Sequence, residues 1–340
     1  MRLIFIGFGT VGQGLAELFV KKRKHLSDEY GLDPKIVGIA DKVMGSVLDP
    51  EGIDLQKALN LAGESGSLSG FSDHMFNKDA VAMIQEAEAD VMLEATYTDI
   101  KTAEPATTHI RTALQKKMHV VTTNKGPLAL FYHDLARLAA ENGVQFLFEG
   151  TVMSGTPVIN LFREALAGCS IQEVKGILNG TTNYILTRME EGLSYEEALK
   201  KAQELGYAEA VPDADVLGWD ALAKVTILAN VVFGADKDPS DFSCDGITGI
   251  SVEQIAEAKN RGKRFKLIGH VWREGMQVQA SVGPQEMVLS HPLAGVMGAT
   301  NAVTVSTDTL GDVTIVGPGA GRMETGYSML VDLIKIGGIK

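Results

Sequence analysis

The chain has 340 residues, of which 45% are hydrophobic and 22% are charged, and this composition excludes a disordered protein. It carries 31 Lys and Arg against 43 Asp and Glu, a formal net charge of −12, which argues against nucleic acid and anionic membrane as partners. Two cysteines, Cys169 and Cys244, are too few for a disulfide framework and favour a cytoplasmic location. At about 150 residues per domain, the length predicts two domains.

Over the first 150 residues, short apolar runs alternate with helical segments. The runs predicted as buried strands are Leu3–Ile6, Ile36–Ala40, Val91–Ala95, Val120–Thr123 and Phe146–Phe148. Helices are predicted from Val11 through Phe19 and over Leu130–Asn142, where Gly143 ends the second one. The stretch Gly63–Ser67 is predicted to be a loop. This alternation indicates an α/β domain with a doubly wound parallel sheet.

After residue 150 the helices and the strands are grouped. Helices are predicted over Pro157–Leu166, from a capping box at Ser194 to Gly206, over Ala214–Phe233, from a capping box at Ser251, and around Tyr327–Ile336. Strands are predicted over Ile171–Leu178, Leu267–Trp272, Val278–Val282, Ala302–Ser306 and Val313–Val316. Grouped helices followed by grouped strands indicate a second domain of the α+β class.

The segment Gly7-Phe8-Gly9-Thr10-Val11-Gly12 has the form G-x-G-x-x-G and lies between a predicted strand and a predicted helix. Such glycines permit a tight turn and let the backbone approach a pyrophosphate at the helix N-terminus. We therefore predict a dinucleotide site. Thr10 has the chemistry of an N-cap in this turn.

Asp41 follows the second predicted strand, where an acidic residue commonly binds the cofactor ribose. In that role its carboxylate would accept hydrogen bonds from both ribose hydroxyls and repel the 2′-phosphate of NADP. Lys42 follows directly and could pair with that phosphate, so the choice between NAD and NADP stays open, with a lean to NAD. A solvated charge at a strand end is the alternative interpretation of Asp41.

Lys125 follows another buried strand in Thr122-Thr123-Asn124-Lys125. Ligands of doubly wound sheets bind outside the carboxyl ends of the strands, so Lys125 is predicted to face the cofactor. A surface charge is the alternative.

A second charged cluster spans Gly206 to Lys224. Asp220 and Lys224 are four residues apart on a predicted helix, hence on one face, and Glu209, Asp213 and Asp215 lie just upstream. Carboxylates of this kind would hold a substrate ammonium group while the lysine moves a proton. An exposed ion pair is the alternative.

Five motifs together resemble the homoserine dehydrogenases, and the resemblance runs from the glycine motif to the C-terminus. The motifs are Thr122–Lys125, Phe148–Pro157, Ile177–Leu186, Gly206–Lys224 and Gly317–Gly321. The resemblance implies NAD(P)-dependent interconversion of L-homoserine and L-aspartate 4-semialdehyde, at a branch point towards threonine, methionine and isoleucine.

The resemblance also implies roles for individual residues. Lys224 would be the proton donor and acceptor, and Lys125 would assist at the reacting oxygen. Glu209 and Asp220 would bind the substrate with Asp215 close by, and Gly180, Thr181 and Tyr207 would line its pocket. Gly206 and Gly321 match cofactor contacts of the family. Together with these two, the expected cofactor contacts beyond the glycine motif are Asp41, Lys42, Thr96, Lys125 and Gly319. A monovalent cation, usually Na⁺, would be held mostly by backbone oxygens at Glu149, Val152, Ser154 and Thr156.

Several positions depart from the family pattern. Val211 and Leu217 stand where the family commonly has acids, and Met153-Ser154 replaces a pair of small residues. Arg322 stands where a small residue is common, so it could touch the nicotinamide ribose or the pyrophosphate.

The expected organisation is a Rossmann-type dinucleotide-binding domain, residues 1–133 with 311–340, around a catalytic and dimerisation domain, residues 134–310. Glycines 7, 9, 12, 206, 319 and 321 would line one cofactor crevice. We expect a homodimer, by resemblance alone, and a short form without the C-terminal regulatory domain of many members. A catalytically silent NAD(P)-binding redox sensor is the alternative function. Such a sensor would need only the cofactor-binding glycines, so the presence of Lys125, Lys224, Glu209 and Asp220 argues against it. A dehydrogenase acting at an amino acid's α-amine is a further alternative.

Overall fold

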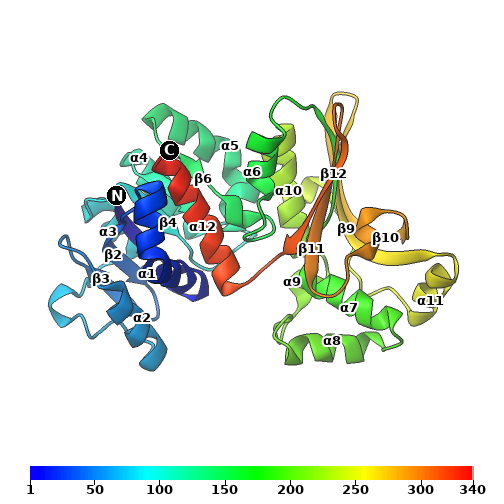
Figure 1. The fold of residues 1–340 in the computed structure, drawn as a ribbon, viewed down its shortest axis with the longest axis horizontal. Helices are drawn as coiled ribbons and strands as arrows, with labels where there is room; N and C mark the ends of the chain where they lie inside the picture. Colours follow the sequence, from blue (N-terminus) through cyan, green and yellow to red (C-terminus); the bar gives the residue numbers. More distant parts are fainter. Residues whose placement is uncertain (339–340) are drawn as a thin grey trace. The chain divides into compact units, whose positions relative to one another are not determined.

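The computed structural model describes residues 1–338, which form two compact units. Residues 1–155 and 321–338 make up the first unit, and residues 156–320 make up the second (Figure 1). Both boundaries lie later in the chain than the expected ones at 133 and 311. Helix α5 (Lys125–Asn142) runs through residue 133, and strand β12 (Gly311–Pro318) pairs with β11 (Thr300–Thr307) along its whole length. The expected boundaries would therefore cut a helix and separate two paired strands.

The first unit is built on a six-stranded sheet in the order β3-β2-β1-β4-β5-β6. The strands are β1 (Arg2–Ile6), β2 (Lys35–Asp41), β3 (Gly45–Leu48), β4 (Val91–Glu94), β5 (His119–Thr122) and β6 (Phe146–Leu147). Neighbouring strands are parallel except β2 and β3, which are antiparallel. The doubly wound sheet predicted from the sequence is confirmed, and the short edge strand β3 was missed. The strand order reverses between β1 and β4, so the carboxyl ends of these two strands form the usual ligand-binding position.

Helices flank this sheet, and several of them were not predicted. They are α1 (Thr10–Tyr30), α2 (Leu55–Glu64), α3 (Ala80–Glu86), α4 (Ala106–Gln115), α5 and α12 (Arg322–Ile336), with 3₁₀ turns at Ser72–His74 and Glu149–Thr151. The prediction of a loop over Gly63–Ser67 is wrong for its first two residues, which end α2. Helix α5 begins five residues earlier than predicted and is kinked at Phe131 (φ −135°).

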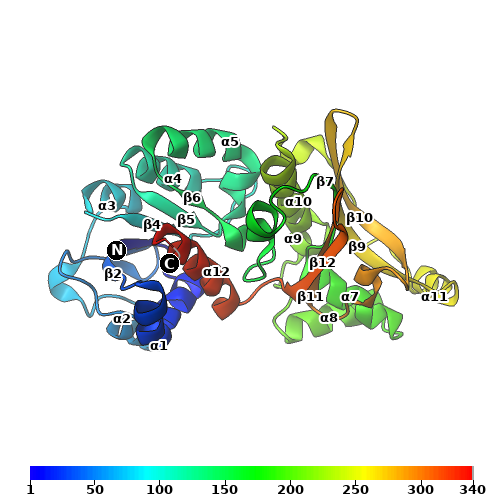
Figure 2. The same cartoon turned by 45° about the horizontal axis from the view of Figure 1, so that its top comes forward.

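Helix α12 returns from the end of the chain to pack along α1 (Figures 1 and 2). A Cβ on Gly14 would lie 2.1 Å from the carbonyl oxygen of Arg322, and a Cβ on Gly326 would lie 2.6 Å from the backbone nitrogen of Leu15. Glycine on each helix therefore allows the two backbones to approach closely. Met329, Leu330 and Leu333 of α12 are buried in the core of the first unit.

The second unit contains another six-stranded sheet, in the order β12-β11-β7-β9-β10-β8. Its remaining strands are β7 (Ile171–Ile177), β8 (Ser243–Cys244), β9 (Lys263–Glu274) and β10 (Gln277–Val288). Its helices are α6 (Val158–Asn160), a π-helical turn Leu161–Ala165, α7 (Gly180–Glu190), α8 (Tyr195–Glu204), α9 (Asp213–Val216), α10 (Trp219–Phe233) and α11 (Val252–Asn260), with 3₁₀ turns at Pro239–Asp241 and Pro292–Gly295. The pairs are antiparallel except β8 with β10, and this mixed sheet with grouped helices confirms the predicted α+β class.

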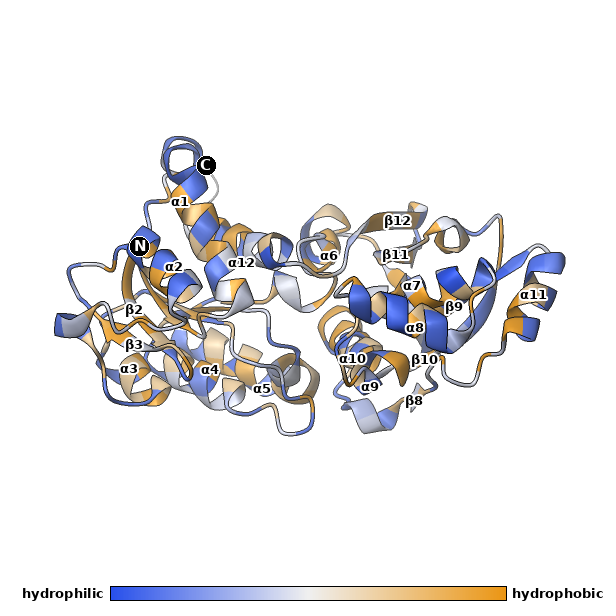
Figure 3. Ribbon diagram, turned by 90° about the horizontal axis from the view of Figure 1, so that it is seen from below, coloured by the Kyte–Doolittle hydropathy of each residue, from blue (hydrophilic) through white to orange (hydrophobic). Residues whose placement is uncertain are grey.

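Local sequence signals explain the helices of this unit. The capping boxes at Ser194 and Ser251 are both formed, as predicted. The single helix predicted over Ala214–Phe233 is wrong, because Gly218 adopts φ +84° and separates α9 from α10. Helix α10 is buried along most of its length, whereas α8 is largely hydrophilic (Figure 3). No helix among the described residues is both long enough and apolar enough to cross a membrane.

Candidate active site

The glycine loop joins β1 to α1 in the first unit. Gly7 has φ +93°, and a Cβ there would lie 2.5 Å from the carbonyl oxygen of Ala95. A Cβ on Gly12 would lie 2.6 Å from the Gly7 carbonyl oxygen, but apart from its two chain neighbours no described residue has an atom within 4 Å of the Cβ position of Gly9. The first and third glycines are therefore required by the fold of the loop, whereas the second leaves open space at the start of α1.

The N-terminus of α1 has the properties of an anion site. Gly9 is its N-cap, no side chain of the described residues caps it, and its first turn holds no acid, so its N–H groups can bind a pyrophosphate. Thr10 is the first helical residue rather than the N-cap, and Val11 is half-buried. Phe8 is fully buried and packs edge-on against Phe5 at 5.6 Å between ring centroids, so only its backbone can reach a cofactor.

Asp41 binds the glycine loop directly. Its Oδ2 accepts a hydrogen bond from the backbone N–H of Phe8 at 2.8 Å, and its Oδ1 accepts from those of Val43 and Met44, each at 2.9 Å. A carboxylate offers about four lone-pair directions, so these three bonds leave about one for a ribose hydroxyl. Lys42, beside it, is exposed.

Lys125 is the half-buried first residue of α5. Asn124 is the N-cap of this helix, and its Oδ1 accepts from the backbone N–H of Gly126 at 3.3 Å. Thr96, an expected cofactor contact, lies just after β4 and directs both its N–H and its hydroxyl to the Glu94 carboxylate. The Thr96 hydroxyl therefore points into the first unit.

Gly321 and Arg322 begin α12. Gly321 is its N-cap with φ +141°, and a Cβ there would lie 2.0 Å from a carboxylate oxygen of Glu324. The Arg322 guanidinium donates to the Gln13 amide oxygen at 3.1 Å and to the Glu17 carboxylate at 2.6 Å. Both partners belong to α1, so the Arg322 side chain joins α12 to α1. The contact with the cofactor that its position in the sequence had suggested is not what this side chain makes.

The expected catalytic lysine of the second unit, Lys224, is buried. Its Nζ donates to Asp220 Oδ2 at 2.7 Å and to the carbonyl oxygen of Leu178 at 2.6 Å, and its exposed fraction is 7%. This is not the exposed i, i+4 pair considered as the alternative. Burial makes such a pair sensitive to the geometry of its partners, unlike pairs at the surface.

Asn179 connects Lys224 to a second carboxylate. Its Nδ2 donates to Asp215 Oδ1 at 2.6 Å and to Asp220 Oδ2 at 3.0 Å. Its Oδ1 accepts from the backbone N–H of Thr182 at 2.9 Å and so caps α7, which fixes the orientation of the amide. Burial raises the pKa of the Asp215 carboxyl above its ordinary value, and the hydrogen bond from Asn179 opposes this shift.

Thr181 and Tyr207 meet each other beside this cluster, whereas Glu209 lies outside it. The Thr181 hydroxyl donates to the Tyr207 carbonyl oxygen at 2.6 Å, and the Tyr207 ring lies 5.1 Å from that of Tyr184. Glu209 is exposed, and its backbone oxygen accepts from Gln203 at 3.1 Å. Among the described residues, no hydrogen bond is seen between the Glu209 carboxylate and Lys224.

Gly180 and Gly319 make room for Asn301 of β11. A Cβ on Gly319 would lie 2.2 Å from Asn301 Cγ, and one on Gly180 would lie 2.5 Å from the carbonyl oxygen of Ala299. Asn301 is fully buried, and neither of its amide atoms has a hydrogen-bond partner among the described residues. Gly206 has φ +75° and is exposed after α8. Gly206 and Gly319 thus belong to the second unit, whereas the other expected cofactor glycines belong to the first.

The segment expected to hold a cation has unusual backbone geometry. Met153 (φ 59°) and Ser154 (φ 52°) are successive left-handed residues, and neither is glycine. Glu149 and Val152 are buried, and the Ser154 hydroxyl hydrogen-bonds to that of Thr325 at 2.7 Å. Thr156 begins the second unit, and there its hydroxyl donates to the carbonyl oxygen of Pro318 at 3.0 Å.

Two family models cover most of the chain. The model described as homoserine dehydrogenase matches residues 157–334, and the model described as homoserine dehydrogenase, NAD binding domain, matches residues 7–149. The chain belongs to the homoserine dehydrogenase family. Its activity is therefore that of an oxidoreductase that uses NAD(P) and acts on a CH–OH group.

Similar homoserine dehydrogenases extend over the whole chain. The NAD(+)-dependent homoserine dehydrogenase of Pseudomonas canavaninivorans is 45% identical over 98% of this chain and 96% of its own length. That of Methanocaldococcus jannaschii is 41% identical over 99% of this chain and 98% of its own length. A crystal structure of a putative homoserine dehydrogenase from Archaeoglobus fulgidus superposes with a TM-score of 0.89, at 39% identity and 99% coverage of both chains. A hyperthermophilic archaeal homoserine dehydrogenase in complex with NADPH superposes with a TM-score of 0.84, at 31% identity and 98% coverage of this chain and 97% of its own.

Two buried polar residues of these networks were missed from the sequence. Asn179 lies within a quoted motif, and a helix-capping signal before Thr182 was available to identify it. Glu94 is the one acid within the predicted strand Val91–Ala95, and a carboxylate in a run that is otherwise buried and apolar is a signal in itself.

Proposed function

We propose that Lys224 is the proton donor and acceptor in the interconversion of L-homoserine and L-aspartate 4-semialdehyde by this chain. The observation that carries this assignment is the burial of Lys224 against Asp220 and Leu178. An ammonium group has three N–H donors, and these two bonds use two of them. The third is left for the reacting oxygen of the substrate.

The chemistry follows from this arrangement. Bound NAD(P) supplies a hydride to the substrate carbon in one direction and takes it up in the other. During reduction, negative charge builds on the substrate oxygen, and the Lys224 ammonium group stabilises that charge and donates its free proton. Asp220 keeps Nζ oriented through this transfer. Asp215 and Glu209 supply the negative charge for the substrate's ammonium group, and Gly180, Thr181 and Tyr207 line its pocket.

For the cofactor, we propose that the N-terminus of α1 binds the pyrophosphate and that Asp41 binds the adenosine ribose. The single acceptor direction left on Asp41 suits a ribose hydroxyl, and the charge of this carboxylate disfavours the 2′-phosphate of NADP. We therefore propose a preference for NAD. Lys125 would assist at the reacting oxygen from the first turn of α5.

The expected monovalent cation is a further part of the proposal. The described residues contain no group of three or more His, Cys, Asp or Glu side chains arranged to hold a metal, so the ligands would be backbone and hydroxyl oxygens. The successive left-handed residues Met153 and Ser154 support this assignment, because strained backbone of this kind clusters at ligand sites. Glu149, Val152 and Ser154 would contribute backbone oxygens.

We also propose a homodimer and a cytoplasmic location. Strand β12 is an edge strand of the second unit's sheet, and its Val316 is 53% exposed, which supports association through this sheet. Cys169 and Cys244 are both free thiols, as a reducing compartment would require. A silent redox sensor is not favoured, since the family model matched over residues 157–334 includes the Lys224 cluster.

The deciding assay measures NAD⁺ and NADP⁺ reduction with L-homoserine, with L-aspartate, L-threonine and L-malate as controls. We expect activity with L-homoserine and a higher kcat/KM with NAD⁺. Lys224→Ala should lower kcat by a factor of about 10²–10⁴ while NADH still binds. Lys237→Ala is the matched control, because Lys237 also forms an i, i+4 pair, with Asp241 at 3.2 Å, but at the surface. Unchanged turnover in Lys224→Ala would refute the assignment of Lys224 as the proton donor and acceptor. Inactivity of the wild type with L-homoserine would refute the proposed reaction.

A further inference from the structure

Glu94 is a fully buried carboxylate that the proposed mechanism does not use. It is the last residue of β4, with Ile6 of β1 on one side and Thr122 of β5 on the other. This is the position at which the strand order of the first unit reverses, and where ligands of doubly wound sheets bind. A buried carboxylate is costly unless hydrogen-bond donors surround it, so its partners matter.

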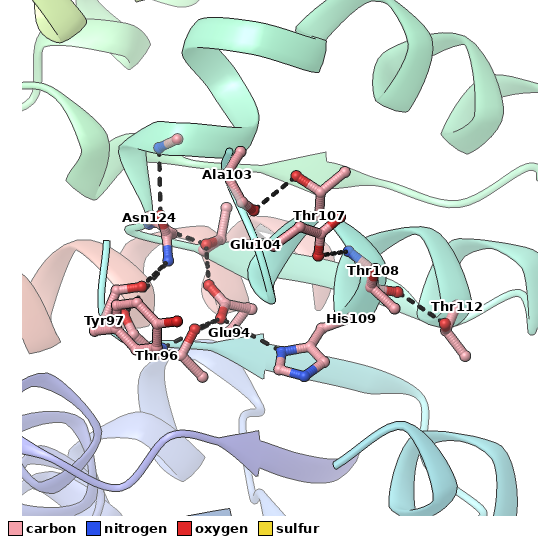
Figure 4. Close-up of polar contacts among 12 residues, drawn as sticks. Glu94, Thr96, Tyr97, Ala103, Glu104, Thr107, Thr108, His109, Thr112 and Asn124 are labelled. Atoms are coloured by element: carbon pink, nitrogen blue, oxygen red, sulfur yellow. Dashed lines mark hydrogen bonds and ion pairs between the residues drawn. The ribbon is translucent and has the colours of Figure 1, made fainter. Parts of the chain in front are cut away.

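The hydrogen-bond partners of Glu94 come from two different segments (Figure 4). Its Oε1 accepts from the backbone N–H of Thr96 at 3.2 Å and from the Thr96 hydroxyl. Its Oε2 accepts from the Thr122 hydroxyl at 3.0 Å. His109 of α4, which is also buried, places Nδ1 3.8 Å from Oε1. The carboxylate thus joins the loop after β4 to the end of β5.

The same network continues to the first turn of α5. The Thr122 hydroxyl donates to Glu94 and accepts from the backbone N–H of Asn124 at 3.0 Å. Asn124 then caps α5 with its Oδ1 and donates from Nδ2 to the carbonyl oxygens of Tyr97 at 3.0 Å and Thr96 at 3.4 Å. Because Asn124 directly precedes Lys125, the hydrogen bonds of this N-cap fix the position of the Lys125 backbone at the start of α5.

We propose that Glu94 is a positioning residue for the reaction: through Thr122 and Asn124, its carboxylate holds the start of α5 and thereby places Lys125. This inference rests on the proposed function, in which Lys125 assists at the reacting oxygen. Glu94 acts as an acceptor toward three donors, and the backbone N–H of Thr96 among them can only donate. The N–H₂ of a glutamine at this position would either face the Thr96 N–H, where two donors meet, or face the Thr122 hydroxyl and reverse that hydrogen bond, so the network would change in either orientation.

The closing experiment compares Glu94→Gln and Thr122→Val with the wild type. Both variants nearly keep the shape of the side chain. Glu94→Gln replaces one acceptor oxygen by an amide donor, and Thr122→Val removes the hydroxyl that links β4 to α5. We expect kcat with L-homoserine to fall about 10- to 100-fold in each, because displacement of a catalytic group by an ångström has effects of this size. NADH affinity should change less than about threefold, since the glycine loop and Asp41 are left in place.

Two further variants separate positioning from folding. Thr122→Ser keeps the hydroxyl and should restore most of the activity lost in Thr122→Val. Thr107→Val is the matched control: Thr107 is 4% exposed, and its hydroxyl bonds to the Ala103 carbonyl oxygen at 2.9 Å within the same unit, without touching Glu94. Its kcat should remain that of the wild type.

A double-mutant cycle with Lys125→Ala decides whether Glu94 acts through the lysine. In that background, Glu94→Gln should lower kcat by less than about twofold, because the group it positions is gone. The inference would be overturned if Glu94→Gln lowered kcat as much in the Lys125→Ala background as in the wild type, or if kcat were unchanged in the single variant Glu94→Gln. If instead the wild type fails to oxidise L-homoserine, the proposed function is refuted.

Discussion

Lys266 of the second unit is buried and has no role in the proposed mechanism, and it should make the stability of that unit depend on pH. Its exposed fraction is 1%, and its Nζ donates to Asn183 Oδ1 at 2.9 Å and to the Val296 carbonyl oxygen at 2.5 Å. Burial lowers the pKa of the Lys266 ammonium group from 10.5 to about 8, although the nearby Glu190 carboxylate raises it.

The sign of the effect follows from proton binding. Between pH 8 and 10.5 the folded unit binds fewer protons at Lys266 than the unfolded chain does, so its stability rises with pH there. A pKa difference of about 2.5, at 1.36 kcal/mol for each pKa unit, corresponds to about 3 kcal/mol. Lys266→Met removes the titrating group. The unfolding free energy of the wild type minus that of the variant should therefore increase by about 3 kcal/mol as the pH rises from 8 to 10.5.

Tryptophan fluorescence is a suitable probe for this measurement, since both tryptophans, Trp219 and Trp272, belong to the second unit. Urea unfolding would be followed at several pH values from about 7.5 to about 10.5. Lys263→Met is the matched control, because Lys263 lies on the same strand with its side chain partly in solvent. A wild-type-minus-variant difference that stays flat for Lys266→Met would refute the reasoning.

Two predictions concern the Lys224 cluster. Because burial raises the pKa of Asp215, its ionised form destabilises the fold above the ordinary Asp pKa, so Asp215→Asn should raise the unfolding free energy at neutral pH while lowering kcat/KM for L-homoserine. The gain should vanish as the pH falls below about 3.9, and a destabilised variant at pH 7 would contradict the account. Asn179→Ser can still cap α7 but cannot bridge Asp215 and Asp220, so kcat/KM should fall about 10- to 100-fold. The unfolding free energy at neutral pH should also fall, because the buried Asp215 carboxylate loses a hydrogen-bond donor. Stopped-flow kinetics and urea titration of this variant would test this, and a loss of stability with unchanged kcat/KM would show Asn179 to be merely structural.

The sequence predicted the sheet of the first unit because its strands are short apolar runs separated by clear turns. The glycine motif could be placed for the same reason, since its meaning depends only on the strand before it and the helix after it. Helix α3 was missed because it has only seven residues, and the edge strand β3 has four residues with no strong alternation. Helices α2 and α4 have ten residues each and an amphipathic pattern, so the signal for them was present in the sequence.

The candidate site was harder to predict where it depends on partners distant in sequence. The spacing of Asp220 and Lys224 places them on one face of a helix, but it cannot reveal that Leu178 and Asn179 complete their hydrogen bonds from the end of another strand. Arg322 illustrates the reverse case. Its neighbours in sequence are glycines expected at the cofactor, whereas its guanidinium binds α1, more than 300 residues earlier in the chain.

The return of α12 to α1 has a consequence for the order in which the protein is made. Synthesis proceeds from the N-terminus at about 5–20 residues per second, so the chain of the second unit is complete before α12 emerges. The face of α1 that α12 covers, including Gly14, therefore stays uncovered in the nascent first unit until residues 322–336 have emerged. Ribosome-bound chains that end before residue 322 should therefore expose apolar surface along α1.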